Sequence, residues 1–364
     1  MRLGVAAAVV DGAIVRGDVE LADGRVAAVG RPGAGSGIAI PGLVDLQVNG
    51  YAGIDVLAAE PGELVELGRA LARDGVLAYQ PTLVSAPPEA TREALSTIGQ
   101  ALALGGPSRI LGAHLEGPFL SPERAGAHAV EHLREPSLDL LASFLLQGCP
   151  VTTVTLAPEL DGADEQIEAL AERGILVSLG HTDATAVQAH AGFDLGARAV
   201  THCFNAMRPF AHRDPGTAGA ALAREDVTVM LVADGTHVAP ETLLTAWRAA
   251  RGRLVLVSDA IAAGGLGDGR YRLGPVEVEV ADGVSRLADG TLAGAVRPLA
   301  WGLRWLVELG VPIAEAVDAV TRVPAALVGR PEVARLVPGA PADLVVLDDD
   351  FAVARVLVGG AELG

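Results

Sequence analysis

The feature that most constrains the fold is a regular alternation of short apolar runs with longer helical stretches between residues 43 and 257. Such an alternation predicts a parallel sheet whose strands are connected by helices and buried on both faces. Eight strand–helix units over about 250 residues predict a (β/α)8 TIM barrel. The apolar runs are residues 43–48, 77–84, 110–115, 151–156, 176–179, 199–202, 227–232 and 254–257.

The stretches that separate the runs are rich in Ala, Leu, Glu and Arg and have the pattern of amphipathic helices. Aromatic residues make up only 3% of the chain, so Val, Leu, Ala and Ile must fill most of the core. Beyond the eighth run, residues 271–287 predict an inserted hairpin. The predicted helices are residues 62–73, 89–103, 165–173 and 240–251, with closing helices over 299–309 and 313–327.

Both ends of the chain consist of short apolar runs joined by turn residues. Asp11-Gly12 and Asp23-Gly24 each separate two such runs, which is a strong hairpin signal. Residues 338–360 repeat this pattern, so we expect both ends to pair into one small β-sandwich. The predicted domains are 1–41 and 337–364 for the sandwich and 42–336 for the barrel. The glycine-rich residues 33–37 lack the GxGxxG spacing and a following helix, so they predict a turn.

Charge and composition limit the kinds of partner that this chain is expected to bind. The formal net charge of −18 argues against nucleic acid and against an anionic membrane surface, because both attract clustered cations. No apolar stretch reaches the ~20 residues that span a bilayer. The N-terminal apolar run is interrupted at Asp11, which makes a poor signal peptide, so we expect a cytoplasmic protein. Cys149 and Cys203 have no paired spacing and are expected to be buried free thiols.

Histidines and acidic residues stand where several of the runs end, and catalytic groups of TIM barrels gather at the carboxyl ends of the strands. Glu116, His181 and His202 supply a carboxylate and two imidazoles, a ligand set suited to Zn²⁺ or Fe²⁺ with an open position for water. Taken alone, each is more often a hydrogen-bonded histidine or a helix-capping glutamate. Their convergence at neighbouring strand ends favours a metal site.

A free carboxylate stands at the end of the eighth run. A divalent metal lowers the pKa of its bound water towards ~7, and forming hydroxide requires a proton acceptor. Asp259 is the candidate base, and it could then pass its proton to a leaving amine. The alternative for Asp259 is a helix N-cap. His237, after the seventh run, could polarise a carbonyl or stabilise the developing oxyanion.

Several motifs along the chain carry a family resemblance. They are PGLVDLQVNG at 41–50, HLEGPF at 114–119, GHTDAT at 180–185, THCFNAM at 201–207 and Asp-Gly-Thr-His at 234–237. In this order they resemble the N-acetylglucosamine-6-phosphate deacetylases of the amidohydrolase superfamily, and the resemblance covers nearly the whole chain. It implies removal of acetate from the 2-acetamido group of a phosphorylated amino sugar, in amino-sugar catabolism and cell-wall recycling, usually by a homodimer.

The resemblance also implies roles for individual residues. It assigns the metal to Glu116, His181 and His202, and proton transfer to Asp259. It assigns phosphate binding to Arg213, acting in its own or the neighbouring subunit. Arg208 on the same loop is an alternative phosphate ligand, and either residue could instead be a solvated arginine. The implied substrate contacts are Ala127, His128, Asn205, Ala206, Arg213, Asp234, Gly235, Thr236, His237, Leu292, Ala293 and Gly294.

One position departs from the wider superfamily, in which many members carry His-x-His after the first strand for a second metal. Here the chain has Gln47 and Asn49, and neutral amides are poor zinc ligands. The chain also has no lysine that could be modified to bridge two ions. We therefore expect one metal ion per subunit.

Two other functions stay open at this stage. The same scaffold could open a cyclic amide or deaminate a heterocycle, because the site and not the fold decides the reaction. Asn205, Arg213 and His128 suit a polar phosphosugar better than a planar ring, and few aromatic residues are present to stack on one. A barrel that binds without catalysing is the third possibility, which intact candidate ligands and Asp259 argue against.

Overall fold

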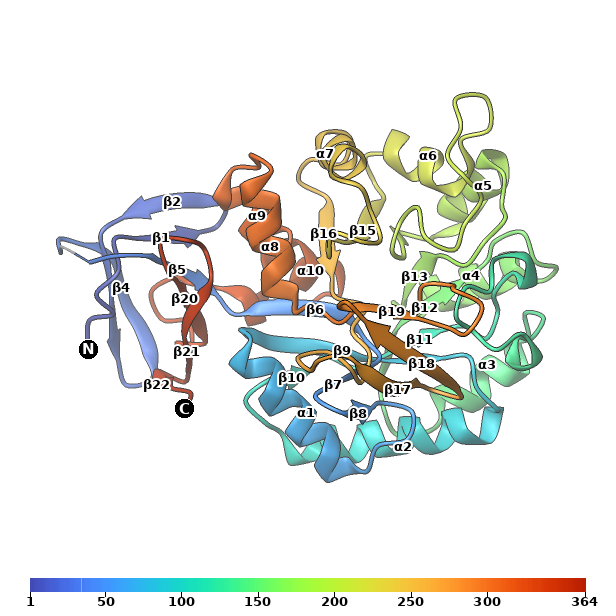
Figure 1. The fold of residues 1–364 in the computed structure, drawn as a ribbon, viewed down its shortest axis with the longest axis horizontal. Coiled ribbons are helices and arrows are strands. Elements are labelled where there is room, and N and C mark those ends of the chain that lie inside the picture. Colours follow the sequence, from blue (N-terminus) through green and yellow to red (C-terminus); the bar gives the residue numbers. More distant parts are fainter. Residues whose placement is uncertain (34) are drawn as a thin grey trace.

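The computed structural model describes residues 1–33 and 35–364 and has a nearly closed parallel barrel at its centre (Figure 1). Strand β9 pairs with both β6 and β11, and each later barrel strand pairs in parallel with the next as far as β16. The bridge between Val48 and Ala260 connects the two ends of the ring. The barrel strands are β6 (Leu43–Val48), β9 (Val76–Val84), β11 (Ala113–Glu116), β12 (Val151–Leu156), β13 (Leu176–Leu179), β14 (Ala199–Val200), β15 (Thr228–Val232) and β16 (Leu254–Val257).

The predicted runs correspond to these strands with two differences. The third run is divided into β10 (Arg109–Ile110) and β11, because Gly112 adopts a positive φ between them. The sixth run pairs only over β14, so His202 lies in the turn that follows the strand. The TIM-barrel prediction is confirmed.

Helices surround the barrel (Figure 1). In α1 the apolar residues Leu64, Leu67 and Leu71 recur at helical spacing and are buried, and Glu60 and Glu63 form a capping box at its N-terminus. The helices are α1 (Pro61–Arg73), α2 (Pro88–Leu104), α3 (Leu138–Leu145), α4 (Ala163–Glu172), α5 (Ala186–Leu195), α6 (Gly216–Ala223), α7 (Pro240–Ala249), α8 (Leu299–Glu308), α9 (Ile313–Asp318) and α10 (Arg322–Leu327). Short 3-10 turns lie at η1 (Pro122–Arg124), η2 (Val130–His132) and η3 (Pro331–Ala334).

The last predicted helix, residues 313–327, is two helices. Pro324 lacks the N–H that a continuous helix would need, and it is tolerated only in the first turn of a new helix. The chain therefore leaves the helix after Asp318 and begins α10 at Arg322, which places Pro324 in that first turn.

The barrel interior becomes polar towards the carboxyl ends of the strands. In β11 His114 and Glu116 are two residues apart and share one face, as the pleat of a strand requires. His114 contacts Thr155 through Nε2 at 2.8 Å, and Thr155 and Ser178 both hydrogen-bond to Thr201. Thr155 is also the register partner of Glu116, so this buried network lies beside the proposed ligand and orders the strands on which the site is built.

The two ends of the chain form a separate β unit beside the barrel, and both termini lie in it (Figure 1). One sheet has the order β2-β1-β5-β20-β21-β22, and β3 pairs with β4. Apolar side chains from both sheets, including Val19, Ala39 and Leu344, form its core. Its strands are β1 (Ala7–Val10), β2 (Ala13–Arg16), β3 (Asp18–Ala22), β4 (Arg25–Arg31), β5 (Ile38–Pro41), β20 (Leu344–Leu347), β21 (Val353–Val358) and β22 (Ala361–Glu362).

This unit confirms the predicted small terminal β domain, although β5 was not among the expected strands. The predicted turn at 33–37 contains Ala34, which lies outside the described residues. The predicted hairpin at 271–287 is a three-stranded sheet, because Gly283 supplies the positive φ of a second tight turn. Its strands are β17 (Gly269–Leu273), β18 (Val276–Ala281) and β19 (Val284–Arg286), and a two-stranded ladder joins β7 (Gly50–Tyr51) to β8 (Ile54–Asp55). Within the described residues, no helix combines the length and the apolar character that crossing a bilayer requires.

Candidate active site

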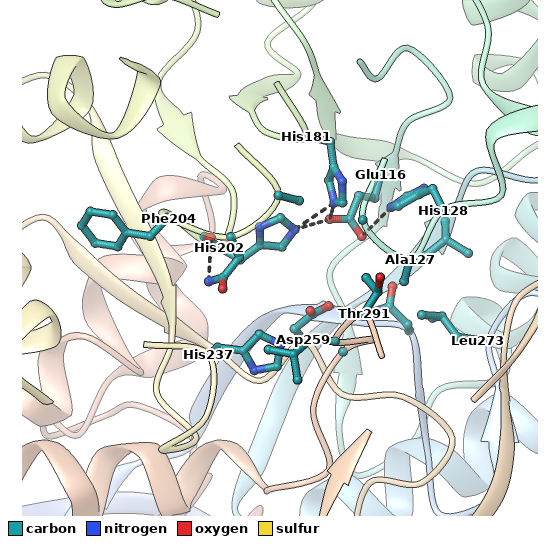
Figure 2. A pocket seen from close by; sticks show the side chains of 17 residues that line it. Glu116, Ala127, His128, His181, His202, Phe204, His237, Asp259, Leu273 and Thr291 are labelled. Carbon is teal, nitrogen blue, oxygen red and sulfur yellow. Dashed lines mark hydrogen bonds and ion pairs between the residues drawn. The ribbon is translucent and has the colours of Figure 1, made fainter. Parts of the chain in front are cut away.

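A cavity of about 330 Å³ lies at the carboxyl ends of the barrel strands (Figure 2). Glu116 enters it from the end of β11, His181 and His202 from the turns after β13 and β14, and Asp259 from the turn after β16. His181, His202 and Asp259 all have positive φ values, which are costly for residues other than glycine. The surrounding barrel holds these three strained turns so that their side chains face one another.

The predicted metal ligands converge. Nε2 of His202 lies 2.9 Å from Oε1 of Glu116 and 3.1 Å from Nε2 of His181, and Nε2 of His181 lies 3.3 Å from the same carboxylate oxygen. Ligand atoms about 2.0–2.2 Å from a tetrahedral zinc ion are separated by about 3.3–3.6 Å. The three atoms are 2.9, 3.1 and 3.3 Å apart, slightly closer than this, so small side-chain shifts would let them bind one ion.

The hydrogen bonding of His181 also supports a role as a metal ligand. Its Nδ1 lies 3.0 Å from the backbone carbonyl of Arg124, which can only accept, so Nδ1 carries the proton. The lone pair of Nε2 is then directed at Glu116 and His202. A backbone carbonyl that fixes the tautomer and ring orientation of a histidine is a common support for a metal ligand.

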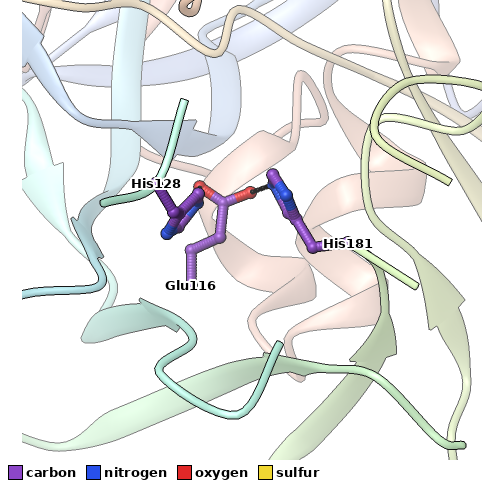
Figure 3. A group of neighbouring side chains, drawn as sticks. All are labelled: Glu116, His128 and His181. Atoms are coloured by element: carbon purple, nitrogen blue, oxygen red, sulfur yellow. Dashed lines mark ion pairs between the residues drawn. The ribbon is translucent and has the colours of Figure 1, made fainter. Parts of the chain in front are cut away.

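His128 is the third histidine of the cluster. Glu116, His128 and His181 present possible ligand atoms within 4.8 Å of one another, and Figure 3 shows the Glu116 carboxylate between the two rings. However, the backbone N–H of Ser85 donates to Nδ1 of His128 at 3.1 Å. In the neutral ring the proton is therefore on Nε2, which lies 3.7 Å from Oε2 of Glu116. This tautomer makes His128 a hydrogen-bond donor into the cavity, so His202 suits the ligand role better than His128 does.

The surroundings of the cavity shift the pKa values of its two carboxyl groups, Glu116 and Asp259. Burial alone would raise the pKa of Glu116, but contacts with His128, His181 and His202 outweigh it and hold that pKa well below the ordinary value. Burial, with the nearby charge of Glu116, raises the pKa of Asp259 to about 6. Two neighbouring carboxyl groups whose pKa values are shifted in opposite directions are typical of an acid–base site.

The two amides at the end of β6 contact these carboxylates. Nε2 of Gln47 donates to Oε1 of Glu116 at 2.8 Å, and Nδ2 of Asn49 donates to Oδ1 of Asp259 at 2.7 Å. Among the described residues, neither amide oxygen has a hydrogen-bond partner, although both are buried. Gln47 and Asn49 occupy the positions at which many members of the superfamily have His-x-His. Here these two residues orient the carboxylates of Glu116 and Asp259.

His237 is held by Asp234. Its Nδ1 donates to Oδ2 of Asp234 at 2.8 Å, and the other carboxylate oxygen accepts the backbone N–H groups of Thr236 and His237. Nε2 of His237 is left free, and His237 lines the cavity, whereas Asp234, Gly235 and Thr236 are not part of the lining. Asp234 therefore contributes to the cavity by holding the His237 ring in place.

The remaining predicted substrate contacts are divided between the cavity and its surroundings. Ala293 is buried behind the wall, next to the core residue Ile261. Arg213 is exposed on the 208–215 loop, outside the lining. Arg208, its rival, forms ion pairs with Asp183 and Asp214. The predicted contacts that line the cavity are Ala127, His128, Asn205, Ala206, His237, Leu292 and Gly294.

Sequence reasoning missed several parts of the site. Ser85 follows the second apolar run, and the same test of strand ends would have found it. Val84, Leu273 and Thr291 also line the cavity without having been predicted. Leu273 comes from the inserted sheet, and no local pattern indicates that this sheet reaches the barrel mouth.

The barrel, the converging ligands and the adjacent carboxylate define a hydrolase of the amidohydrolase type. The chain belongs to the Amidohydrolase family, whose model matches residues 38–363. Its relatives place it more narrowly among the N-acetylhexosamine-6-phosphate deacetylases. It is 42% identical to human N-acetylglucosamine-6-phosphate deacetylase, over 91% of this chain and 84% of the relative. It is 39% identical to N-acetylgalactosamine-6-phosphate deacetylase of Escherichia coli O157:H7, over 88% of this chain and 86% of the relative.

Solved structures agree with this placement. The chain matches a mutant N-acetyl-D-glucosamine-6-phosphate deacetylase from Mycobacterium smegmatis, in complex with N-acetyl-D-glucosamine-6-phosphate, with a TM-score of 0.94 and 36% identity. The match covers 100% of this chain and 99% of that one. The Thermotoga maritima deacetylase has a TM-score of 0.92 at 32% identity and covers the same shares. A D-hydantoinase at 15% identity and a TM-score of 0.62 shares the fold alone.

Proposed function

We propose that this protein hydrolyses the acetamide of an N-acetylhexosamine 6-phosphate, chiefly N-acetyl-D-glucosamine 6-phosphate, to acetate and the amino sugar phosphate. The observation that carries the proposal is the convergence of Glu116, His181 and His202 within 3.3 Å of one another, in a cavity that Asp259 also lines. Relatives at about 40% identity are named for this reaction.

The donor set fits one divalent ion, Zn²⁺ or Fe²⁺, held by Glu116, His181 and His202. Two imidazole nitrogens that face each other at 3.1 Å beside a carboxylate oxygen are electrostatically satisfied by a shared cation. When bound, the ion supplies a Lewis acid and lowers the pKa of a water ligand towards about 7. Gln47 and Asn49, as amides, do not provide a second set of ligands.

Asp259 takes the proton of the attacking water as its oxygen forms a bond to the acetyl carbon. As the C–N bond breaks, the same carboxyl group returns the proton to the leaving amine. Without the ion, burial and the charge of Glu116 raise the pKa of Asp259 to about 6. A bound divalent cation favours the ionised carboxylate, the form in which Asp259 can accept the proton of the water. Asn49 holds Oδ1 by a hydrogen bond, which leaves Oδ2 for the transfer.

The carbonyl oxygen needs a donor as negative charge develops on it. His128 meets this need in its neutral form, because Ser85 fixes the proton on Nε2. His237 can serve only when its ring is protonated, because its Nδ1 proton is already donated to Asp234. We therefore assign the carbonyl oxygen to His128 and a substrate hydroxyl to His237, whose Nε2 accepts the hydroxyl proton in the neutral ring.

The phosphate needs a cation that the cavity of one chain does not provide. Among the described residues that line it, the only basic side chains are histidines. Arg208 is neutralised by two aspartates, whereas Arg213 is exposed on a loop that extends from the barrel (Figure 1). A fork of guanidinium N–H groups is well suited to phosphate. We propose that Arg213 enters the cavity of a second subunit, so that the active form is a homodimer.

The experiment that tests the function is an acetate-release assay on a panel of sugars. The panel contains N-acetylglucosamine, N-acetylgalactosamine and their 6-phosphates, each with and without a chelator. The proposal expects turnover of the phosphorylated sugars, little turnover of the free sugars, and loss of activity with the chelator. Hydrolysis of hydantoins or deamination of heterocycles in place of acetate release would overturn it.

A further inference from the structure

The cavity has an apolar side that the proposed proton and phosphate chemistry does not use. Val84 and Leu273 line it and are only 6% and 4% exposed, and Ala127 and Leu292 complete this apolar wall. Figure 2 shows Ala127 and Leu273 on one side of Glu116 and Asp259, with Phe204 on the opposite side. The two ends of the cavity are therefore chemically different.

The apolar wall is rigid. Val84 ends β9 and is the direct register partner of Glu116 in β11, so its position is tied to a proposed metal ligand. Leu273 ends β17 and packs in one cluster with Val84, Val278 and Val280. The backbone N–H of Gly274 donates to Asp55 at 2.7 Å, which fixes the turn beyond Leu273. A wall supported from behind in this way cannot easily yield to a larger ligand group.

The substrate can lie in the cavity in only one direction if the proposed function holds. Its acetyl carbon must lie between the ligand triad and Asp259. The sugar and its phosphate then extend towards the side of Phe204, which packs against Phe210 of the Arg213 loop with ring centroids 6.4 Å apart. In a two-fold symmetric dimer the loop that leaves this edge of the cavity and the partner subunit's loop that enters the cavity lie side by side, so the phosphate is expected at this edge. At the trigonal acetyl carbon the bonds to the methyl group and to the nitrogen diverge by about 120°, so the methyl group is directed away from the sugar, towards the apolar wall.

We infer that Val84 and Leu273 form an acyl pocket that fits a methyl group and selects acetamides over longer N-acyl sugars. Each added methylene would meet side chains that are already packed against the inserted sheet. Discrimination by one methylene in such a pocket is about 10-fold or more. The inference rests on the proposed deacetylase function and names the acyl chain that this site accepts.

The test compares kcat/KM for N-acetyl-, N-propionyl- and N-butyryl-glucosamine 6-phosphate, measured by release of the free amine. Wild-type protein should show a fall of about 10-fold with the first added methylene. Leu273→Ala and, separately, Val84→Ala should raise the propionyl-to-acetyl ratio by about 10-fold. Two separate variants keep the test decisive if one of them folds poorly.

Val280→Ala is the matched control, because Val280 belongs to the same packed cluster but does not line the cavity. It should leave the propionyl-to-acetyl ratio unchanged. An unchanged ratio in both pocket variants, with the acetyl substrate still hydrolysed, would overturn the acyl pocket and leave the deacetylase intact. Absence of amine release from every substrate by wild-type protein would instead overturn the proposed function.

Discussion

Nδ2 of Asn49 donates a hydrogen bond of 2.7 Å to Oδ1 of Asp259, between the ends of the first and last barrel strands. Both side chains are buried, so the bond is shielded from water and fixes which carboxylate oxygen faces the substrate. The amide of Asn49, which holds the carboxylate proposed as the base, occupies the position at which many members of the superfamily carry a metal-binding histidine.

Replacing Asn49 by Ala should lower kcat by about 10–100-fold with little change in KM, because the base loses its orientation while the sugar contacts remain. Asn49→Asp should be more harmful, because a second carboxylate would repel Asp259. Steady-state kinetics with a metal determination on the same samples checks this. Unchanged kcat in the Ala variant would show that Asn49 does not position Asp259 for the reaction.

Asp259→Asn should retain the metal and lose turnover by about 1,000-fold or more, since an amide cannot accept a proton from water. Elemental analysis and single-turnover kinetics on one preparation separate the two effects. A variant that binds metal and hydrolyses the substrate at the wild-type rate would exclude Asp259 as the base.

Arg213→Ala should raise KM for the phosphorylated sugar by about 10–100-fold, the contribution of charge-assisted hydrogen bonds, and leave the slow reaction of the free sugar unchanged. Arg335→Ala serves as the control, because Arg335 is also exposed but directly follows η3 and does not line the cavity. Equal effects on both sugars would contradict a phosphate role.

Mixing Arg213→Ala chains with Asp259→Asn chains tests whether the arginine acts across the dimer. A shared site restores one complete centre in each mixed dimer, so at substrate concentrations well below KM about a quarter of the wild-type kcat/KM should be measured after exchange. No recovery in mixtures whose subunits have exchanged would show that Arg213 serves its own chain.

Asp45 gives the fold a defined pH dependence. Burial raises its pKa from 3.8 to about 7, although Ser258 and Gln47 donate backbone hydrogen bonds to it. Between these values the folded protein keeps a proton that the unfolded chain releases, so rising pH favours unfolding by up to about 1.4 kcal/mol per pH unit. Asp45→Asn should remove this component.

Urea unfolding of the two proteins at pH 5, 6 and 7 provides the check on Asp45. The variant should gain stability relative to wild type as the pH rises through this range. A constant difference between the two unfolding free energies would show that Asp45 is ionised in the folded state.

The barrel was predictable because its strands are short, mostly apolar runs that alternate with helical stretches, and several of these runs are followed by His, Asp or Glu. This is why Glu116, His181, His202 and Asp259 could be placed near one another from the sequence. The contacts that tune them could not, since Asn49 and Asp259 are 210 positions apart and Ser85 meets His128 in a loop without periodicity. The expected homodimer and cytoplasmic location concern surroundings of the chain and stay predictions.

The central claim is that Glu116, His181 and His202, and not His128, hold one divalent ion. Elemental analysis of purified wild-type, His202→Ala and His128→Ala proteins, each shown to be folded by its thermal transition, tests it directly. We expect about one ion per chain in the wild type and in His128→Ala, and almost none in His202→Ala. Loss of the ion from His128→Ala with its retention in His202→Ala would contradict it.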